Sequence, residues 1–208
     1  MTKAADYFVV ERLRDGTSIE IRALRSDDRN DMLAAIGRTS AQSLQRRFFV
    51  PKRGLSDNEV SFFMNIDFDD HVALVAQVNE NGRPVIVGGG RVQPGQAELA
   101  LVVVDDYQGK GIGKTLLRHL IAIAREAGLQ QLTAEVLPEN AAMLKVFNGF
   151  DFHSEASRDP CARHLVLRLT WVALEIIAEQ PRINAYIFAG RGRVHINAFF
   201  KGEKAARR

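Results

Sequence analysis

The sequence has few of the features that mark secreted, metal-binding or membrane proteins. It contains one cysteine, Cys161, and one tryptophan in 208 residues. A single cysteine excludes an internal disulfide. No apolar stretch approaches the roughly 20 residues of a membrane-spanning helix, and the first six residues do not resemble a signal peptide. We therefore expect a cytoplasmic protein that does not bind a membrane. Asp69, Asp70 and His71 lack the further ligands that a metal site needs, so no metal is expected.

The positive charge of the chain lies near its C-terminus. The formal net charge is +3, and residues 181–208 hold seven Lys or Arg and one Glu, a net of +6. Residues 1–180 therefore carry −3, and this body lacks the basic face of a nucleic-acid-binding domain. We expect no nucleic-acid partner. We divide the chain into one domain, residues 1–170, and a basic C-terminal extension, residues 171–208.

The most informative stretch, residues 97–115, reads AELALVVVDDYQGKGIGKT. Its apolar run predicts a strand, and the amphipathic residues 116–127 after it predict a helix. The turn between them has glycine at positions 109, 111 and 113. Backbone N–H groups that side chains do not cover, at the positive end of a helix, bind phosphate. Lys110 and Lys114 add positive charge to this site.

The spacing of the glycines excludes two common phosphate-binding motifs. A P-loop needs a glycine five residues before its Gly-Lys-Thr, and that position is Gln108. The dinucleotide fingerprint needs G-x-G-x-x-G, whereas this turn reads G-x-G-x-G. What remains is Gln-x-x-Gly-x-Gly between a strand and a helix.

This pattern resembles the pyrophosphate-binding loop of the GNAT family (Gcn5-related N-acetyltransferases), which uses acetyl-CoA. Pro138-Glu139-Asn140 followed by Gly149-Phe150 is a second similarity, and the whole resemblance covers about residues 17–170. The run Ser43-Leu44-Gln45-Arg46-Arg47-Phe48-Phe49 resembles the Pat-type protein lysine acetyltransferases, although a surface helix with an apolar face would read the same way. The resemblance implies an α/β (α+β) protein with the GNAT fold, in which a mixed, mostly antiparallel sheet has a central βαβ crossover and flanking helices.

Hydrophobic periodicity predicts the individual elements. We expect a hairpin of residues 7–13 and 17–24, then helices that start near Ser26, Ser40 and Ser56, the last with Glu59 in a capping box. Strands follow at 71–79, 85–93 and 96–104, then at 131–137, from Gly149-Phe150 onward, and at 163–169. Three glycines, 88–90, inside one strand predict a bulge or the close approach of a ligand or neighbouring backbone. In the extension we expect a short helix over 171–180 and a hairpin of 184–189 with 193–199.

The resemblance also implies which residues act. Glu98 corresponds to the glutamate proposed as general base in Pat-like relatives, and we expect its apolar neighbours to shield it; the alternative is a charge on an exposed strand face. Asn140 would bind the pantetheine arm of acetyl-CoA or only cap its helix. Phe147 replaces a tyrosine that serves as the acid in many relatives, so no side-chain acid is expected. The implied cofactor-binding residues are Val102 and Val104 for the pantetheine arm, and Gln108, Gly109, Lys110, Gly111, Ile112, Gly113 and Lys114 for the pyrophosphate.

The sequence thus predicts an acetyl-CoA-dependent N-acetyltransferase whose favoured acceptor is a protein lysine. A small-amine acetyltransferase of the same fold and a non-catalytic acetyl-CoA-binding regulator are the alternatives. A nucleotide hydrolase ranks third, because the P-loop glycine is absent. A homodimer is one option for the assembly.

Overall fold

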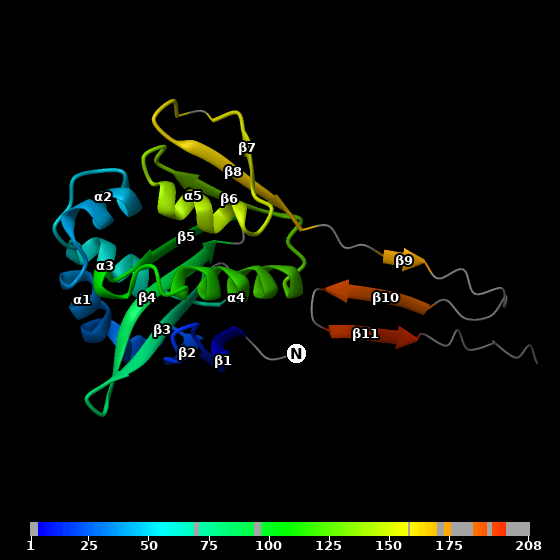
Figure 1. Cartoon of the computed structure of the whole chain (residues 1–208), viewed down its shortest axis with the longest axis horizontal. Coiled ribbons are helices and arrows are strands. Elements are labelled where there is room, and N and C mark those ends of the chain that lie inside the picture. Colours follow the sequence, from blue (N-terminus) through cyan, green and yellow to red (C-terminus); the bar gives the residue numbers. More distant parts are fainter. Residues whose placement is uncertain are drawn as a thin grey trace, which may run out of the picture. The chain divides into compact units, whose positions relative to one another are not determined.

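The computed structural model describes residues 4–68, 71–93, 97–157 and 159–169, together with the strand backbones at 173–175, 185–190 and 193–198. The chain divides into two compact units, Met1–Leu169 and Thr170–Arg208 (Figure 1). No helix of the described residues is long and apolar enough to cross a membrane. The cytoplasmic location stays a prediction.

The first unit is built on one eight-stranded sheet with the order β1-β2-β3-β4-β5-β6-β8-β7. All neighbouring strands run antiparallel except β5 and β6, which are parallel and connected through helix α4. This is the mixed sheet with a central crossover that the sequence predicts. The strands are β1 (Phe8–Arg12), β2 (Ser18–Ala23), β3 (Val72–Glu80), β4 (Arg83–Gln93), β5 (Glu98–Val103), β6 (Gln131–Val136), β7 (His153–Glu155) and β8 (Arg163–Arg168).

Five α-helices flank this sheet: α1 (Arg29–Gly37), α2 (Ala41–Phe48), α3 (Asp57–Met64), α4 (Ile112–Glu126) and α5 (Ala141–Asn148). The predicted caps of α2 and α3 are confirmed. Ser40 Oγ accepts a hydrogen bond from the N–H of Ser43, and Ser56 forms a capping box with Glu59. Short 3-10 turns cover Ala4–Asp6, Ser26–Asp28 and Asp105–Tyr107.

Two of the three glycines of β4, Gly88 and Gly90, allow helix α4 to pack closely on the sheet. A Cβ on Gly90 would lie 2.3 Å from Leu101 Cδ2 and 2.7 Å from Leu120 Cδ1 on α4, and a Cβ on Gly88 would lie 3.1 Å from the carbonyl oxygen of Val102. The register of β3 and β4 also shifts between Ala76 and Gln77. The predicted bulge and the predicted close approach are therefore both present.

The parallel strands β5 and β6 separate almost as soon as they meet. Their register contains a single pair, Glu98 with Thr133. Just before it, the N–H of Thr133 donates to the carbonyl oxygen of Ala97 at 2.7 Å. Beyond Glu98, β5 remains paired with β4, while β6 pairs with β8. The sheet therefore opens toward the carboxyl end of β5, where the glycine-rich loop begins.

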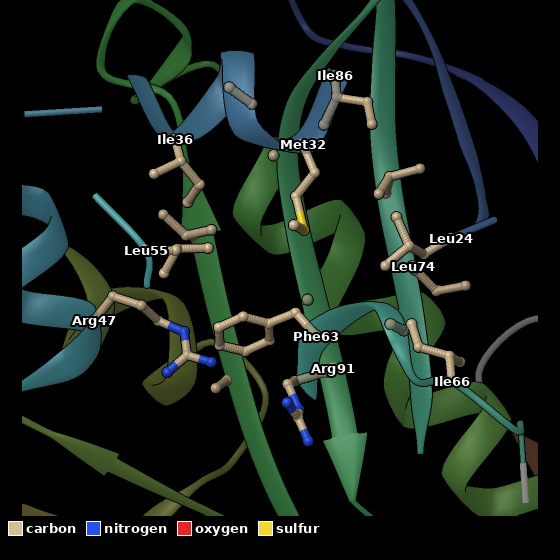
Figure 2. Close-up of a pocket in the computed structure, with 18 of the residues that line it drawn as sticks. Leu24, Met32, Ile36, Arg47, Leu55, Phe63, Ile66, Leu74, Ile86 and Arg91 are labelled. Carbon is tan, nitrogen blue, oxygen red and sulfur yellow. The ribbon is translucent and has the colours of Figure 1, made fainter. Parts of the chain in front are cut away.

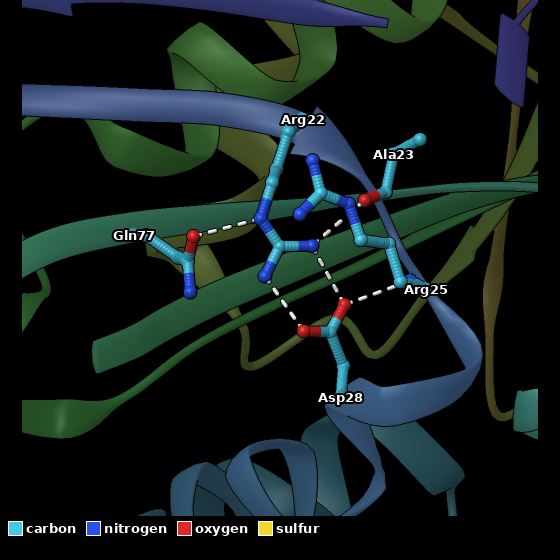
Figure 3. Close-up of polar contacts among 5 residues, drawn as sticks. All are labelled: Arg22, Ala23, Arg25, Asp28 and Gln77. Atoms are coloured by element: carbon cyan, nitrogen blue, oxygen red, sulfur yellow. Dashed lines mark hydrogen bonds and ion pairs between the residues drawn. The ribbon is translucent and has the colours of Figure 1, made fainter. Parts of the chain in front are cut away.

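Helices α1 and α3 pack on the opposite face of the sheet from α4, where Ala35 and Met64 meet Val75 and Ile86. One end of this layer is held by a buried ion pair. The Arg22 guanidinium donates two hydrogen bonds of 2.6 Å to Asp28, and its Nε donates to Gln77 Oε1 at 2.7 Å (Figure 3). The pair thus connects strands β2 and β3 to the start of α1.

This ion pair also corrects the predicted start of the first helix. Asp28 accepts a hydrogen bond from the N–H of Arg25 at 2.7 Å, so residues 26–28 form a 3-10 turn and α1 begins at Arg29 rather than directly after Ser26. A second correction concerns Gly149-Phe150. These residues follow the last turn of α5, and strand β7 begins at His153, after Asp151 takes a left-handed φ of 64°.

The second unit contains a three-stranded antiparallel sheet with the order β11-β10-β9. Its strands are β9 (Ala173–Glu175), β10 (Ala185–Gly190) and β11 (Arg193–Ala198). Strands β10 and β11 pair as the predicted hairpin of 184–189 with 193–199, except that β10 extends one residue further, to Gly190. The short helix predicted over 171–180 is wrong at 173–175, which form a strand, and its other residues lie outside the described part. That residues 171–208 form a separate extension stays a prediction.

We expect Asp28→Asn to lower the free energy of unfolding at pH 7 by about 3–5 kcal/mol, because the change leaves Arg22 buried without its counter-charge. Urea unfolding followed by circular dichroism measures this effect. The control is Asp27→Asn, on the exposed neighbouring residue, which should change stability by less than about 0.5 kcal/mol. Equal effects of the two changes would contradict the role of the ion pair.

The same ion pair predicts a pH dependence. Burial alone would raise the pKa of Asp28, but hydrogen bonds from Arg22 and Arg25 outweigh it and hold that pKa below its ordinary value. A carboxyl group whose pKa is lower in the folded than in the unfolded state stabilises the fold above the unfolded value of about 3.9. Its contribution is lost as the pH falls through the folded value. The stability difference between wild type and Asp28→Asn should therefore shrink below about pH 4.

Candidate active site

A cleft of about 700 Å³ occupies the opening between β5 and β6. Its walls come from β5 (residues 98–103), from the loop after it (107–114), from Glu135 and Val136 of β6, and from α5. All the sequence-predicted site residues except Val104 line this one cleft. Separation of the two strands therefore brings together residues that are up to 42 positions apart, from Glu98 to Asn140.

The glycine-rich loop presents a row of free backbone donors to the cleft. Gly109 and Gly111 take left-handed φ angles of 75° and 97°, a conformation that favours glycine. Gly111 is the N-cap of α4, and the first N–H with a partner inside this turn belongs to Thr115. Within the described residues, the N–H groups of residues 109–114 form no hydrogen bond. Six consecutive donors at the positive end of a 15-residue helix form an anion site.

Two lysines beside this loop strengthen its positive potential. Lys110 Nζ lies 4.6 Å from the centre of the Tyr107 ring, and Lys114 Nζ lies 5.8 Å from that of Phe150. Neither lysine forms an ion pair with a carboxylate of the described residues. Both ammonium groups are therefore free of carboxylate partners in the described part of the chain, and their binding to a pyrophosphate stays a prediction.

Gln108 positions the loop rather than offering its own donors. Its backbone N–H already donates to the carbonyl oxygen of Asp105 at 3.1 Å. Its side-chain Nε2 donates to Val103 O at 3.0 Å and to Ser43 Oγ at 3.1 Å. Gln108 thus holds the loop against the end of β5 and against α2, and the free backbone N–H groups begin at Gly109.

Asp105 fixes the loop to helix α2 from the other side. Its carboxylate accepts hydrogen bonds from Ser40 N at 2.7 Å, Ser40 Oγ at 2.9 Å and Ser43 Oγ at 2.8 Å. Burial raises the pKa of Asp105, but these hydrogen bonds outweigh it and hold the pKa below its ordinary value. Sequence reasoning missed this contact, because no local pattern relates residue 105 to a helix start 65 positions earlier.

The pairing of β5 with β4 determines which backbone groups of β5 face the cleft. Val104 donates its N–H to Val87 O at 2.9 Å, so this group belongs to the β4–β5 ladder. Hydrogen-bonded and free pairs alternate along antiparallel strands. Val102, two residues away, therefore also faces β4, and the groups of Leu101 and Val103 face the cleft. The carbonyl oxygen of Val103 accepts a hydrogen bond from Gln108, which confirms that the backbone groups of Val103 point away from β4.

Glu98, at the start of β5, and Asn140, at the start of α5, both line the cleft. Glu98 is the first residue of β5, where the two strands touch, and its side chain is exposed, so the expectation that apolar neighbours shield it is wrong. Asn140 caps α5, and its Oδ1 accepts from Met143 N at 3.2 Å. Capping uses only the oxygen of the Asn140 amide, which leaves the Nδ2 donor for a ligand in the cleft.

Comparisons with known proteins agree on one family. The model of the "Acetyltransferase (GNAT) family" matches residues 39–152. Acetyltransferase PA5475 of Pseudomonas aeruginosa is 36% identical over 155 residues, which cover 73% of this chain and 82% of that protein. Acetyltransferase Pat of Mycolicibacterium smegmatis is 33% identical over 144 residues, 66% of this chain and 42% of the relative.

The solved structures lead to the same family. The GNAT domain of S. lividans PAT superposes with a TM-score of 0.72 at 31% identity, over 78% of this chain and 97% of that domain. The chain belongs to the GNAT family of acetyltransferases. It is therefore an enzyme that uses acetyl-CoA as its co-substrate.

We expect Gly111→Val to raise the dissociation constant for acetyl-CoA at least about tenfold. A β-branched residue at a φ of 97° costs on the order of 1–3 kcal/mol, and relaxation of that strain moves the row of N–H groups. Isothermal titration calorimetry measures the change. Gly82→Val is the matched control, because Gly82 has a φ of 82° and nothing within 4 Å of its Cβ position, but lies outside the cleft. Wild-type affinity in Gly111→Val would remove the loop from the cofactor site.

Proposed function

We propose that this protein transfers the acetyl group of acetyl-CoA to the side-chain amine of a protein lysine. The observation that carries the proposal is the cleft itself, which has six free N–H groups at one end and the Glu98 carboxylate at the other. The likeness to proteins named Pat supports lysine as the acceptor. A small amine is the second candidate acceptor.

The residues of the cleft suit the parts of acetyl-CoA. The N–H groups of residues 109–114, with Lys110 and Lys114, would hold the pyrophosphate. The backbone groups of Leu101 and Val103 would pair with the pantetheine amides as an added strand does, and the Asn140 amide would donate to the same arm. A free N–H of β5 beside the thioester would stabilise the negative charge that develops on its carbonyl oxygen.

Glu98 is the proposed general base. A free lysine has a pKa of about 10.4, so fewer than about one amine in a thousand is neutral at pH 7. A base that removes the proton, directly or through one water, contributes roughly 10²–10⁴ in rate. Glu98 suits this role, because its carboxylate is exposed to the cleft and to water. The amine then attacks the thioester carbonyl, and the C–S bond breaks.

We propose that no side chain protonates the departing thiolate. Phe147, at the position of the tyrosine in many relatives, is buried against Phe152 with ring centres 4.8 Å apart. The hydroxyl of Tyr107, which lines the cleft, donates to Glu80 at 2.7 Å, and that hydrogen bond raises its pKa. Tyr107 therefore holds its proton firmly. CoA would leave as a thiolate or take a proton from water.

We expect Glu98→Gln to lower kcat by roughly 10²–10⁴ while the affinity for acetyl-CoA stays unchanged, because the substitution keeps the shape but removes the base. Steady-state kinetics and calorimetry separate the two effects. Glu135→Gln tests the other glutamate of the cleft, which is already bound to His164 at 2.6 Å. An unchanged rate in Glu98→Gln, with a loss in Glu135→Gln, would reverse the assignment.

The acceptor class is tested with labelled acetyl-CoA and a bacterial lysate, with wild type and Glu98→Gln side by side. Label in protein bands that disappears in the variant would support lysine acetylation, and mass spectrometry would identify the modified residues. Label confined to small molecules would favour the small-amine alternative. Binding of acetyl-CoA without any transfer would favour a regulator.

A further inference from the structure

A second cavity lies on the face of the sheet that α1 and α3 cover, next to β5. It has a volume of about 110 Å³ and is almost wholly apolar, with walls from Met32, Ile36, Leu55, Phe63, Ile66 and Ile86 (Figure 2). It meets the cofactor cleft directly, because Arg47, Ala100 and Val102 line both spaces. A group in this cavity would therefore lie beside the reacting thioester.

Two arginines stand at one end of this cavity. Figure 2 shows the side chain of Arg47, from α2, directed toward the Phe63 ring, whereas Arg91, from β4, starts close to Phe63 and directs its guanidinium group away from it. The guanidinium carbon of Arg91 lies 4.5 Å from the centre of the Phe62 ring and 5.4 Å from that of Phe63. That of Arg47 lies 5.0 Å from the Phe48 ring centre. Aromatic rings thus hold both guanidinium groups in place.

The side chains of Arg47 and Arg91 are half-buried, and their guanidinium groups form no hydrogen bond within the described residues. Burial and then the charge of Arg91 lower the pKa of Arg47 to about 10, and burial lowers that of Arg91. Within the described residues, neither side chain forms a hydrogen bond or an ion pair. Both guanidinium groups therefore keep N–H donors that can bind an anion.

Glu98 compensates only part of this charge. It is the one carboxylate whose field opposes the loss of charge on both arginines. Among the described residues, two guanidinium groups and one carboxylate leave a net positive charge where the cavity meets the cleft. A bare lysine would be repelled there, whereas a carboxylate next to the lysine would be attracted. Apolar walls strengthen that attraction, because they lower the local dielectric constant.

We propose that Arg47 and Arg91 form a carboxylate-binding subsite, which selects acceptor lysines that have a glutamate or aspartate beside them in the sequence. The planar guanidinium groups offer paired donors that match a carboxylate. The pairing of the arginines with the peptide carboxylate orients the acceptor peptide. Glu98 remains free to take the proton of the lysine amine. This inference rests on the proposed transfer to protein lysine.

The test uses two peptides that differ only in Glu or Gln next to a single lysine. We expect wild type to acetylate the Glu peptide with a kcat/KM at least about tenfold higher. That ratio should fall toward one in Arg47→Gln and Arg91→Gln. Arg83→Gln is the matched control, because Arg83 is exposed at the other end of β4 and lines neither space. It should keep the wild-type ratio.

Peptide binding, measured by fluorescence anisotropy with CoA present, separates this inference from the proposed function. If neither peptide is acetylated but the Glu peptide binds more tightly and Arg91→Gln removes the difference, the subsite stands and the lysine reaction fails. If wild type shows no preference in rate or binding, or the ratio survives in both arginine variants, the subsite is overturned. The comparison of peptides on wild type decides the question even where a variant does not fold.

Discussion

The active site depends on how little β5 and β6 touch. A parallel pair in an ordinary sheet is hydrogen-bonded along its whole length, but here one residue pair, Glu98 with Thr133, is the extent of the register. The unused edge of β5 becomes a wall of a cleft, and its free backbone groups can receive an extended ligand. Strand β5 stays hydrogen-bonded to β4, and β6 to β8. The opening therefore removes only hydrogen bonds between β5 and β6.

Hydrogen bonds around the cleft fix the glycine-rich loop and helix α1 in place. Asp105 and Gln108 connect the phosphate loop to α2, and Arg22 with Asp28 connects α1 to the sheet. Hydrogen bonds to the charged Asp105 and Asp28 side chains therefore join the loop to α2 and α1 to the sheet, and bonds to ionised groups are stronger than those between neutral groups. A ligand in the cleft finds its donors already oriented, which lowers the entropy lost on binding.

Much of this arrangement could be predicted from local sequence. Alternating apolar residues predicted the strands, and residues 97–127 form the predicted strand, glycine turn and helix, because these features depend on neighbouring residues. Which β5 residues turn their backbone N–H and C=O groups toward the cleft could not be predicted. The choice between Leu101 and Val102 depends on which of them forms hydrogen bonds with β4. The Asp105 anchor and the approach of Arg47 to Arg91 join residues at least 44 positions apart. Only the folded chain brings them together.

The glycines of β4 connect the two halves of the site. On one face Gly88 and Gly90 allow α4 to approach, which places the N-terminus of that helix at the cleft. On the other face, Gly89 lines the second cavity without placing a side chain in it. Arg91, two residues later in the same strand, lines the same cavity. Side chains at 88 and 90 would push α4 and its donors away, whereas one at 89 would fill the acceptor side. One short segment thus sets the space on both faces, although none of its residues takes part in the chemistry.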